Sequence, residues 1–228
     1  MENKQIITGI DIGTTKIAVV IAECTMEKNQ IRILGVGEAP SNGLKKGVIV
    51  NMEETIESLS LALSEAENQA DIAIDQAFVG ITGDHIRGIN TQGAIAIGGN
   101  NNSSVSAQKE ITDSDVRNVL DLAKAISLPI DRDILHVLPQ EFVIDTMDSI
   151  KDPVGLTGRR LEARVHLITV ATTAATNLAS CAEELGVSVD AMVYQGLASS
   201  IATLAEDEKN LGVVCVDIGA TTTDIIVY

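Results

Sequence analysis

The first 83 residues alternate between short apolar runs and polar turns. Residues 6–12 and 16–23 are apolar and flank Gly13-Thr14-Thr15, so they predict a β-hairpin with a Gly/Thr tip. A third apolar run at 31–39 follows a polar turn at 27–30 and predicts another strand. Runs of this length, separated by turn residues, are typical of neighbouring strands in one sheet.

A helical repeat follows these strands. Asn51 is a good N-cap residue, and Glu54 three residues later completes a capping-box pattern. A short apolar run at 76–81 predicts a further, buried strand. The order strand-strand-strand-helix-strand therefore indicates an α/β sheet with a helix packed on it. The predicted apolar stripe of this helix consists of Ile56, Leu59, Leu63, Ala66 and Ala70.

The pattern changes after Gly83. Residues 98–108 are rich in Gly, Asn and Ser and predict a polar loop that orders poorly. The order strand, helix, strand, strand around this loop predicts a small α+β unit at 84–164, inserted into the first domain. Its expected elements are strand-like pieces at 86–97, a helix capped by Thr112 and Asp115 and ended by Pro129, and strands at 133–145 and 160–170.

The chain then returns to alternating strands and helices. Residues 165–228 are expected to complete one domain together with residues 1–83. Because the chain stops inside the return strand of its last hairpin, we expect a fragment of something longer. The predicted elements are a strand at 166–171, a helix at 173–185 closed by Gly186, a strand at 187–193, a helix at 196–207 and a hairpin at 212–228.

Charge narrows the possible partners. The formal net charge is −16, and the few Lys and Arg residues are scattered without forming a basic stripe. Nucleic-acid phosphates and anionic lipid surfaces would repel such a chain, so we expect no DNA, RNA or direct membrane contact from this stretch. Any site for an anionic nucleotide therefore needs local hydrogen-bond donors or a metal ion to offset repulsion from the chain's net negative charge.

Cysteine usage and the ends of the chain indicate a cytoplasmic protein. Cys24, Cys181 and Cys215 are far apart and odd in number, so they are expected to be small buried hydrophobic residues in a reducing compartment. The polar residues 1–5 lead straight into a strand, which argues against a signal peptide. No run of 18 or more apolar residues is present, so no membrane span is predicted.

One short motif occurs twice. Asp11–Thr15 reads Asp-Ile-Gly-Thr-Thr, and Asp217–Thr221 reads Asp-Ile-Gly-Ala-Thr. Asp, Gly and Thr are common in hairpin turns, so a single copy could be only a turn. Two copies, each at the head of an α/β half, favour a specific function.

The residue types of this motif suit a polyphosphate. Gly lets an anion approach the backbone closely, and successive N–H groups then form a concave anion site. Thr hydroxyls and a lysine add donors, and a carboxylate at each strand end could hold Mg²⁺, directly or through its waters. Two facing hairpins would clamp a polyphosphate from both sides. The candidate binding residues are Asp11, Gly13, Thr14, Thr15, Lys16, Asp217, Gly219, Ala220, Thr221 and Thr222, with Asp11 and Asp217 as metal ligands.

The duplicated loops resemble the two phosphate motifs of the actin, Hsp70 and sugar-kinase superfamily, and within it the chain is similar to the FtsA family of bacterial cell-division proteins. The similarity covers nearly the whole chain, including motifs outside the nucleotide site. The residues that carry it are Gly9–Lys16, Gly35–Gly37 with Gly43–Gly47, His136–Glu141, Pro153–Gly158, His166–Thr169 and Gly196–Ser200.

This resemblance implies an actin-like, ribonuclease H-like fold in which a 1A domain is interrupted by a small 1C domain. It implies ATP and Mg²⁺ as ligands, self-association into actin-like filaments, and recruitment of later division proteins through the 1C domain. It also implies a tie to the tubulin-like FtsZ and a position at the inner face of the cell membrane. In the family, the adenosine pocket, the FtsZ surface and the membrane-binding helix lie in the C-terminal half.

The resemblance also implies a role for Gln195. In actin-like ATPases a Gln or Glu on the helix after the connecting strand positions the attacking water, and Gln195 falls near that place. A polar residue at a helix start is the alternative interpretation. Many relatives have Gly-Gly-Gly-Thr at the second loop, where this chain has Gly219-Ala220-Thr221-Thr222, and each added Cβ narrows access of the γ-phosphate to the backbone. Because hydrolysis is weak in the family, the resemblance implies ATP binding with at most weak ATPase activity. Since half of the clamp is missing, we expect weak or no binding by this stretch alone.

Two other functions share these motifs. A sugar-kinase-type phosphotransferase would need a carboxylate base and a polar sugar pocket, and residues 84–164 show no signature of one. A PilM-like pilus-assembly protein shares the architecture but not the stretches at 136–141 and 153–158. Three histidines, His85, His136 and His166, share no spacing and are expected to be structural. Arg159, Arg160 and Arg164 fit a solvated strand edge or an acidic partner.

Overall fold

A computed structural model describes residues 4–25, 30–98 and 109–228 of the chain. It divides into two compact units, one formed by Met1–Ile86 with Ala171–Tyr228 and the other by Arg87–Val170. The expected turn at 27–29 and the expected polar loop at 99–108 lie outside the described residues.

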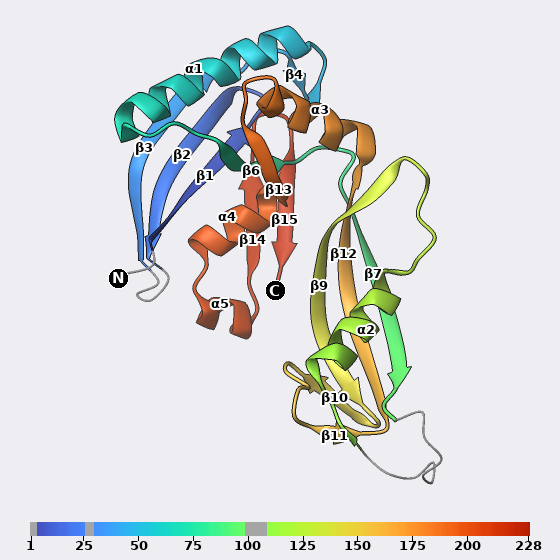
Figure 1. Ribbon diagram of the computed structural model, residues 1–228. Helices are drawn as coiled ribbons and strands as arrows, with labels where there is room; N and C mark the ends of the chain where they lie inside the picture. Colours follow the sequence, from blue (N-terminus) through green and yellow to red (C-terminus); the bar gives the residue numbers. More distant parts are fainter. Residues whose placement is uncertain (1–3, 26–29, 99–108) are drawn as a thin grey trace. The chain divides into compact units, whose positions relative to one another are not determined.

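The first unit is built on a five-stranded mixed sheet, in the order β13-β6-β1-β2-β3 (Figure 1). The hairpin strands β1 and β2 and the next strand β3 run antiparallel, whereas β6 and β13 add parallel strands beside β1. The α/β sheet expected from the pattern is therefore present, with both parallel and antiparallel strands. The strands are β1 (Lys4–Ile12), β2 (Lys16–Thr25), β3 (Gln30–Pro40), β6 (Gln76–Ile81) and β13 (Ser188–Tyr194).

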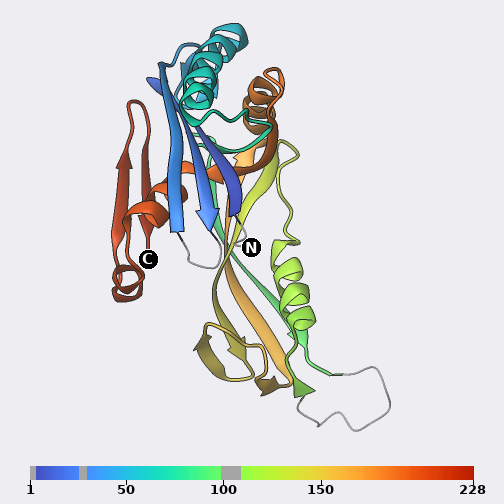
Figure 2. The same cartoon turned by 60° about the vertical axis from the view of Figure 1, so that its left-hand side comes forward.

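One face of this sheet is covered by α1 (Met52–Ala70), as both ribbon views show (Figure 2). The predicted cap is present, because the Asn51 side chain accepts a hydrogen bond from the Glu54 amide. The helix packs unusually close to β3: a Cβ on Gly37 would lie 1.9 Å from the Ala62 carbonyl oxygen. Two short strands, β4 (Leu44–Lys45) and β5 (Val48–Ile49), form the small ladder that precedes the helix.

The buried face of α1 differs slightly from the predicted stripe. Leu59, Leu63 and Ala66 are buried as expected, but Ile56 and Ala70 are only half-buried. Thr55, Ser58 and Ala62 are buried instead. Thr55 is tolerated there because its hydroxyl donates to backbone carbonyl oxygens, so no polar group is left without a partner.

The helix expected at 196–207 is wrong in its extent. The structure has α4 (Gln195–Thr203) and a separate α5 (Glu206–Leu211). Leu204 has extended backbone angles, and the Ala205 amide donates to the Glu208 carboxylate at 2.8 Å, so a new helix N-terminus begins there. The preceding helix is α3 (Thr172–Glu183), which packs beside α1.

The last hairpin consists of β14 (Val214–Ile218) and β15 (Thr223–Val227), which form a two-stranded sheet. Helix α4 contacts both of these strands as well as β13 and β6. On the hairpin's outer side apolar residues stay exposed, including Val216, Ile218 and Ile225.

The second unit is the inserted α+β unit that the pattern predicted. A four-stranded sheet in the order β10-β9-β12-β7 carries α2 on one face, and Val119 and Ala123 of α2 pack with Leu161 and Val165 of β12 in a buried core. The Thr112–Asp115 capping box is present. The elements are β7 (Arg87–Ala96), α2 (Asp113–Lys124), β9 (Arg132–Ile144), β10 (Met147–Ile150) and β12 (Arg160–Ala171), with a small ladder of β8 (Lys109–Glu110) and β11 (Thr157–Gly158).

One prediction for this unit is wrong. The strand-like pieces expected at 86–97 form one continuous strand, β7, because the whole strand pairs antiparallel with β12 from Arg87 to Ala96. Strands β8, β10 and β11 were not predicted. All three are short, and β8 and β11 pair with each other from remote parts of the chain, so local pattern gives little signal for them.

The cysteines are only partly as expected. Cys181 is fully buried, and burial raises the pKa of its thiol to about 11, whereas Cys24 and Cys215 are half-buried. Within the described residues, no helix combines the length and apolar character needed to cross a membrane.

Candidate functional site

The two copies of the repeated loop line one hollow of about 680 Å³ in the first unit. Its walls come from the tips of the β1–β2 and β14–β15 hairpins, from the sheet face opposite α1, and from one side of α4 between Gln195 and Ala202. The lining includes every predicted binding residue except Thr221, and also Gly80, Thr82, Phe78, Gln195 and Ser199.

The two hairpin tips have the same geometry. The Gly13 amide donates to the Lys16 carbonyl at 3.0 Å, and the Gly219 amide donates to the Thr222 carbonyl at 2.9 Å. The strand registers also correspond, because Asp11 pairs with Ala18 and Asp217 pairs with Asp224. The two tips meet directly through the hydroxyls of Thr14 and Thr221, whose oxygens are 2.9 Å apart. The two copies therefore match in three-dimensional structure as well as in sequence.

Each of the two aspartates is held by one side chain of α4. Gln195 Nε2 donates to Asp11 Oδ1, and Ser199 Oγ donates to Asp217 Oδ2, both at 2.5 Å. Gly80 makes the first contact possible, since a Cβ there would lie 3.1 Å from Gln195 Cγ and 3.5 Å from Asp11 Oδ1. Ser199 was not predicted as a site residue, although it lies within Gly196–Ser200, one of the stretches that carry the family resemblance.

Asp11 is solvent-accessible at the edge of the hollow, yet the surrounding protein perturbs it. Desolvation and then the negative charge of Asp217 raise the pKa of the Asp11 carboxyl, and Lys16 and Gln195 offset this only in part. Lys16 itself is exposed and bonded to Glu38 at 2.6 Å. The hollow thus contains carboxylates that repel each other, which is the environment that a divalent cation relieves.

A further carboxylate anchors the second hairpin to the sheet. Asp224 accepts hydrogen bonds from Thr82 Oγ1 at 2.7 Å and from Tyr194 OH at 2.9 Å. Sequence reasoning missed these three residues. Asp224 occupies the place that Ala18 has in the first copy, so comparison of the two loops could not reveal it.

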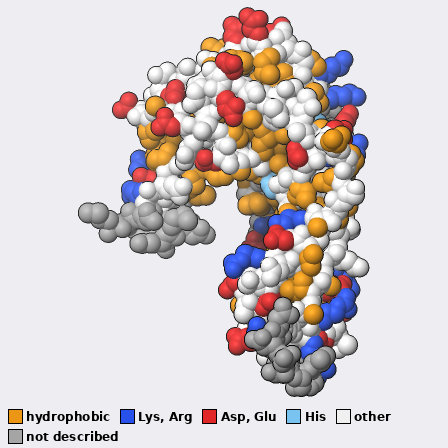
Figure 3. Space-filling model, turned by 45° about the vertical axis from the view of Figure 1, so that its right-hand side comes forward, with side chains coloured by type: hydrophobic (Ala, Val, Ile, Leu, Met, Phe, Trp, Pro, Cys, Tyr) orange, Lys and Arg blue, Asp and Glu red, His pale blue; other side chains and the backbone are white. Residues whose placement is uncertain are grey.

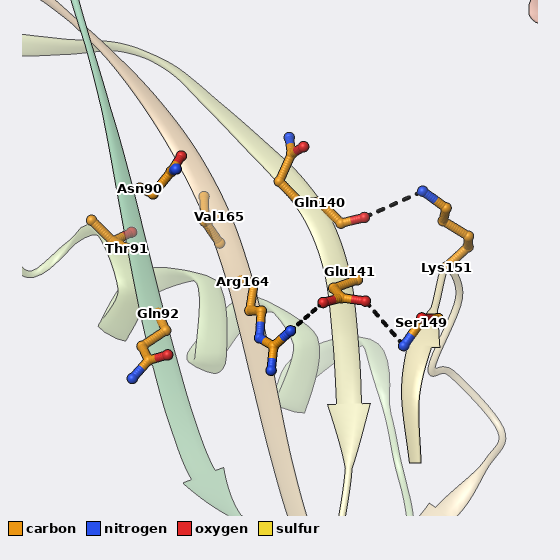
Figure 4. Close-up of a pocket in the computed structure, with 9 residues that line it drawn as sticks. All are labelled: Asn90, Thr91, Gln92, Gln140, Glu141, Ser149, Lys151, Arg164 and Val165. Atoms are coloured by element: carbon orange, nitrogen blue, oxygen red, sulfur yellow. Dashed lines mark hydrogen bonds and ion pairs between the residues drawn. The ribbon is translucent and has the colours of Figure 1, made fainter. Parts of the chain in front are cut away.

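The second unit has a hollow of its own, of about 760 Å³, on the sheet face opposite α2 (Figure 4). Arg164 donates to Glu141 at 2.5 Å, Glu141 also accepts from the Ser149 amide at 3.1 Å, and Lys151 reaches the Gln140 carbonyl at 3.3 Å. These groups pair with one another, whereas the buried hydroxyl of Thr91, which also lines the hollow, has no hydrogen-bond partner among the described residues. This arrangement describes a charged, hydrogen-bonded surface and contains no nucleophile paired with a base.

The remaining histidines and arginines have structural partners or surroundings. His166 Nδ1 lies 2.7 Å from Asn90 Oδ1, and burial lowers the pKa of His136. Arg160 pairs with Glu162 at 2.8 Å. Over the residues that the structure describes, no three His, Cys, Asp or Glu side chains gather in a metal-binding group. On the visible face of the second unit, Lys and Arg side chains lie among Asp and Glu side chains (Figure 3).

Comparison with known proteins agrees with these features. Residues 83–169 match the family described as "SHS2 domain inserted in FTSA". The chain is 42% identical over 228 residues to "Cell division protein FtsA" of Pseudomonas aeruginosa, covering 100% of this chain and 52% of that protein. It is 38% identical over 226 residues to the protein of the same name from Escherichia coli, covering 99% of this chain and 51% of the relative.

A solved structure gives independent support for the fold. The chain superposes on a chain of the "PilM-PilN type IV pilus biogenesis complex" with a TM-score of 0.64, at 14% identity, over 97% of this chain and 57% of that one. Similarity at that identity shows the fold alone, so the relatives named FtsA decide between the two interpretations. The chain spans about half the length of those relatives. Along its whole length, the chain is similar to the cell-division proteins named FtsA.

Proposed function

We propose that this chain supplies the phosphate clamp and the inserted partner-binding domain of an FtsA-type, ATP-binding division adaptor. The observation that supports this most strongly is the pair of equivalent loops that face one hollow and touch through Thr14 and Thr221. Backbone amides of both tips and the surrounding hydroxyls suit a nucleotide polyphosphate.

The proposed roles follow the chemistry of each side chain. Residues Gly13–Lys16 and Gly219–Thr222 bind the phosphates, and Asp11 and Asp217 bind Mg²⁺, directly or through its waters. The raised pKa of Asp11 beside Asp217 fits this assignment, because a divalent cation would offset the repulsion between the two carboxylates. When bound, the cation would neutralise phosphate charge.

Turnover is proposed to be weak at most. Gln195 is the candidate for positioning the attacking water, but its amide nitrogen is engaged by Asp11. The Cβ of Ala220 adds bulk at the second loop, where many relatives have glycine. A phosphotransferase of the sugar-kinase type is the alternative, and steady Mg-ATP turnover with any sugar in a coupled assay would favour it.

The inserted domain is the proposed contact site for neighbouring subunits and for later division proteins. We propose domain limits of 84–164 for it, with 1–83 and 165–228 forming the other domain; the compact units divide at 87 and 170. The sheet face opposite α2 carries exposed Arg160 and Arg164 and is free of a covering helix within the described residues. FtsZ binding and a position at the inner face of the cell membrane are proposed for the full-length protein.

Calorimetry with Mg-ATP tests the nucleotide site. We expect the full-length protein to bind, and the variants Asp11→Ala and Asp217→Ala to lose most of the Mg-dependent affinity. Residues 1–228 alone are expected to bind weakly or not at all, because they provide the phosphate side of the clamp. Micromolar binding by this stretch would refute that second expectation, and no binding by the full-length protein would refute the first.

A pull-down tests the partner assignment. Full-length protein is presented with the C-terminal tail of FtsZ and, as the control, with pilus-assembly peptides. We expect retention of the FtsZ tail only. Retention of the pilus peptides instead would favour the PilM-like alternative.

A further inference from the structure

Helix α4 connects the two copies of the loop through side chains one turn apart. Gln195 and Ser199 are separated by four residues, so they project from the same face of the helix. The first donates to Asp11 and the second to Asp217, with the same donor–acceptor distance of 2.5 Å. A single helical turn therefore holds the two equivalent carboxylates of the repeat.

The bond from Ser199 suits the positioning of a metal ligand. A hydroxyl that donates to one oxygen, Oδ2, restricts the rotation of the Asp217 carboxylate without neutralising its charge. Ser199 is half-buried and lines the hollow, so the bond is shielded from most competing water. Partners of this kind commonly set the orientation of carboxylates that bind metals.

The neighbouring serine has a different task. Ser200 is fully buried, and its hydroxyl donates to the Leu197 carbonyl and lies 2.7 Å from Tyr228 OH. The two adjacent serines of α4 thus have different partners. Ser199 bonds to a carboxylate in the hollow, whereas Ser200 lies in the packed contact between α4 and Tyr228. This gives an internal control for the role of Ser199.

We propose that Ser199 is a positioning residue for Asp217 and thereby sets the affinity of the nucleotide complex for its divalent cation. The proposal rests on the proposed function, since it presumes Mg-nucleotide in the hollow. It assigns to Ser199 no contact with nucleotide. Binding of the phosphates in the absence of metal should therefore be independent of the Ser199 hydroxyl.

The test uses full-length protein and the variants Ser199→Ala, Ser199→Thr and Ser200→Ala. A non-hydrolysable ATP analogue is titrated by calorimetry in EDTA and then at increasing Mg²⁺, so that metal-independent and metal-dependent affinities are separated. For Ser199→Ala we expect apparent Mg²⁺ affinity to fall about 10-fold, with binding in EDTA unchanged. Ser199→Thr should restore the Mg²⁺ affinity, because it keeps the hydroxyl.

Ser200→Ala should lower the melting temperature and leave the Mg²⁺ dependence as in the wild type. On an Asp217→Asn background, Ser199→Ala should have little further effect, because the two residues act through one carboxylate. Equal losses in EDTA and in Mg²⁺, or equal effects of the two serine substitutions, would overturn the proposal. If the wild type binds the analogue without any Mg²⁺ dependence, the proposed metal site fails as well; normal Mg²⁺ dependence in both wild type and Ser199→Ala sinks this inference alone.

Discussion

The two hairpins carry the same motif in very different surroundings. Ile12 and Ile218 occupy the same place in the Asp-Ile-Gly-x-Thr sequence, yet Ile12 is 3% exposed and Ile218 is 77% exposed. Strands β1 and β2 belong to a five-stranded sheet under α1, whereas β14 and β15 form a two-stranded sheet. The loop geometry is nevertheless equal in both. Local sequence therefore determines the tip, and the surroundings determine how strongly it is supported.

The second hairpin depends on side-chain hydrogen bonds where the first depends on apolar burial. Three side chains of the second hairpin make hydrogen bonds outside it. Asp224 bonds to Tyr194 and Thr82. Asp217 bonds to Ser199, and Thr221 bonds to Thr14. Each such bond to a carboxylate contributes about as much as full burial of one large aliphatic side chain. The first hairpin buries several of these side chains, among them Ile10, Ile17 and Ile21. We expect the second hairpin to open more readily than the first.

The largest expected difference comes from truncating the matched isoleucines. In residues 1–228, Ile12→Ala should lower the free energy of unfolding of the first unit by about 3 kcal/mol, because it leaves a cavity in a packed core. Ile218→Ala should change it by less than about 0.5 kcal/mol, since its side chain is already exposed. Urea unfolding followed by hydrogen exchange of β1 and β2 amides measures both. Equal losses would mean that the outer side of the second hairpin is covered in solution.

The anchoring carboxylate should matter next. Asp224→Ala removes the acceptor shared by Thr82 and Tyr194 and should destabilise the closed hairpin by about 2 kcal/mol. Amides of β14 and β15 should then exchange faster, while those of β1 and β2 keep their wild-type protection. Asp207→Ala, an exposed acidic residue of α5, is the matched control and should leave both pairs of strands unchanged. Faster exchange throughout the first unit would contradict a local role.

The direct contact between the tips should have a smaller effect. A double-mutant cycle of Thr14→Val and Thr221→Val should give a coupling free energy of about 0.5–1 kcal/mol for the opening of the second tip. The Gly219 amide, which bonds within that tip, reports the opening by hydrogen exchange. Thr15→Val is the control: it replaces the same residue type in the same way at a position outside the contact, so it should show no coupling to Thr221→Val. Additive effects of Thr14 and Thr221 would show that the hydroxyl contact contributes nothing.

The smallest expected effect concerns pH. The pKa of Asp11 is raised from its usual value of 3.8, so the folded state binds this proton more tightly than the unfolded state does. The contribution of Asp11 to stability therefore becomes less favourable as pH rises through the interval above 3.8. Asp11→Asn, which keeps an oxygen acceptor for Gln195, should be slightly more stable than wild type at pH 7. Thermal unfolding should show that the difference in melting temperature between Asp11→Asn and wild type disappears at pH values below 3.8. A constant difference at all pH values would contradict the raised pKa of Asp11 as its cause.

The parts of the fold that the sequence predicts are those fixed by local interactions. The caps at Asn51 and Thr112 are bonds between residues three apart, so short patterns reveal them. The split between α4 and α5 was missed because the change occurs within a mainly apolar and then acidic stretch that also suits one continuous helix. Strand β7 was missed as a single strand because its polar and Gly positions are stabilised by pairing with β12, more than 60 residues away in the sequence.

The same contrast between local and long-range interactions applies to the candidate site. The loops at Asp11 and Asp217 were found because they repeat each other, and Gln195 came only from the family resemblance. Ser199, Asp224 and Thr82 act through contacts between segments that are separated in the sequence, and each residue type is ordinary in its local context. Only the three-dimensional arrangement distinguishes them from other surface polar residues.

The way in which the second unit begins and ends makes it a separable module. Its first residue, Arg87, pairs with Thr169, next to its last residue, on the adjacent antiparallel strand. The guanidinium of Arg132 ties this end together by donating to both the hydroxyl and the carbonyl of Thr169, at 2.8 Å and 3.0 Å. Chain entry and exit thus lie side by side, which is the arrangement that permits transplantation of a whole segment between hosts. If the inserted unit carries the proposed partner contacts, exchanging residues 87–170 between relatives should alter the partners of a chimaera and leave the hollow lined by the two repeated loops of the host as it was.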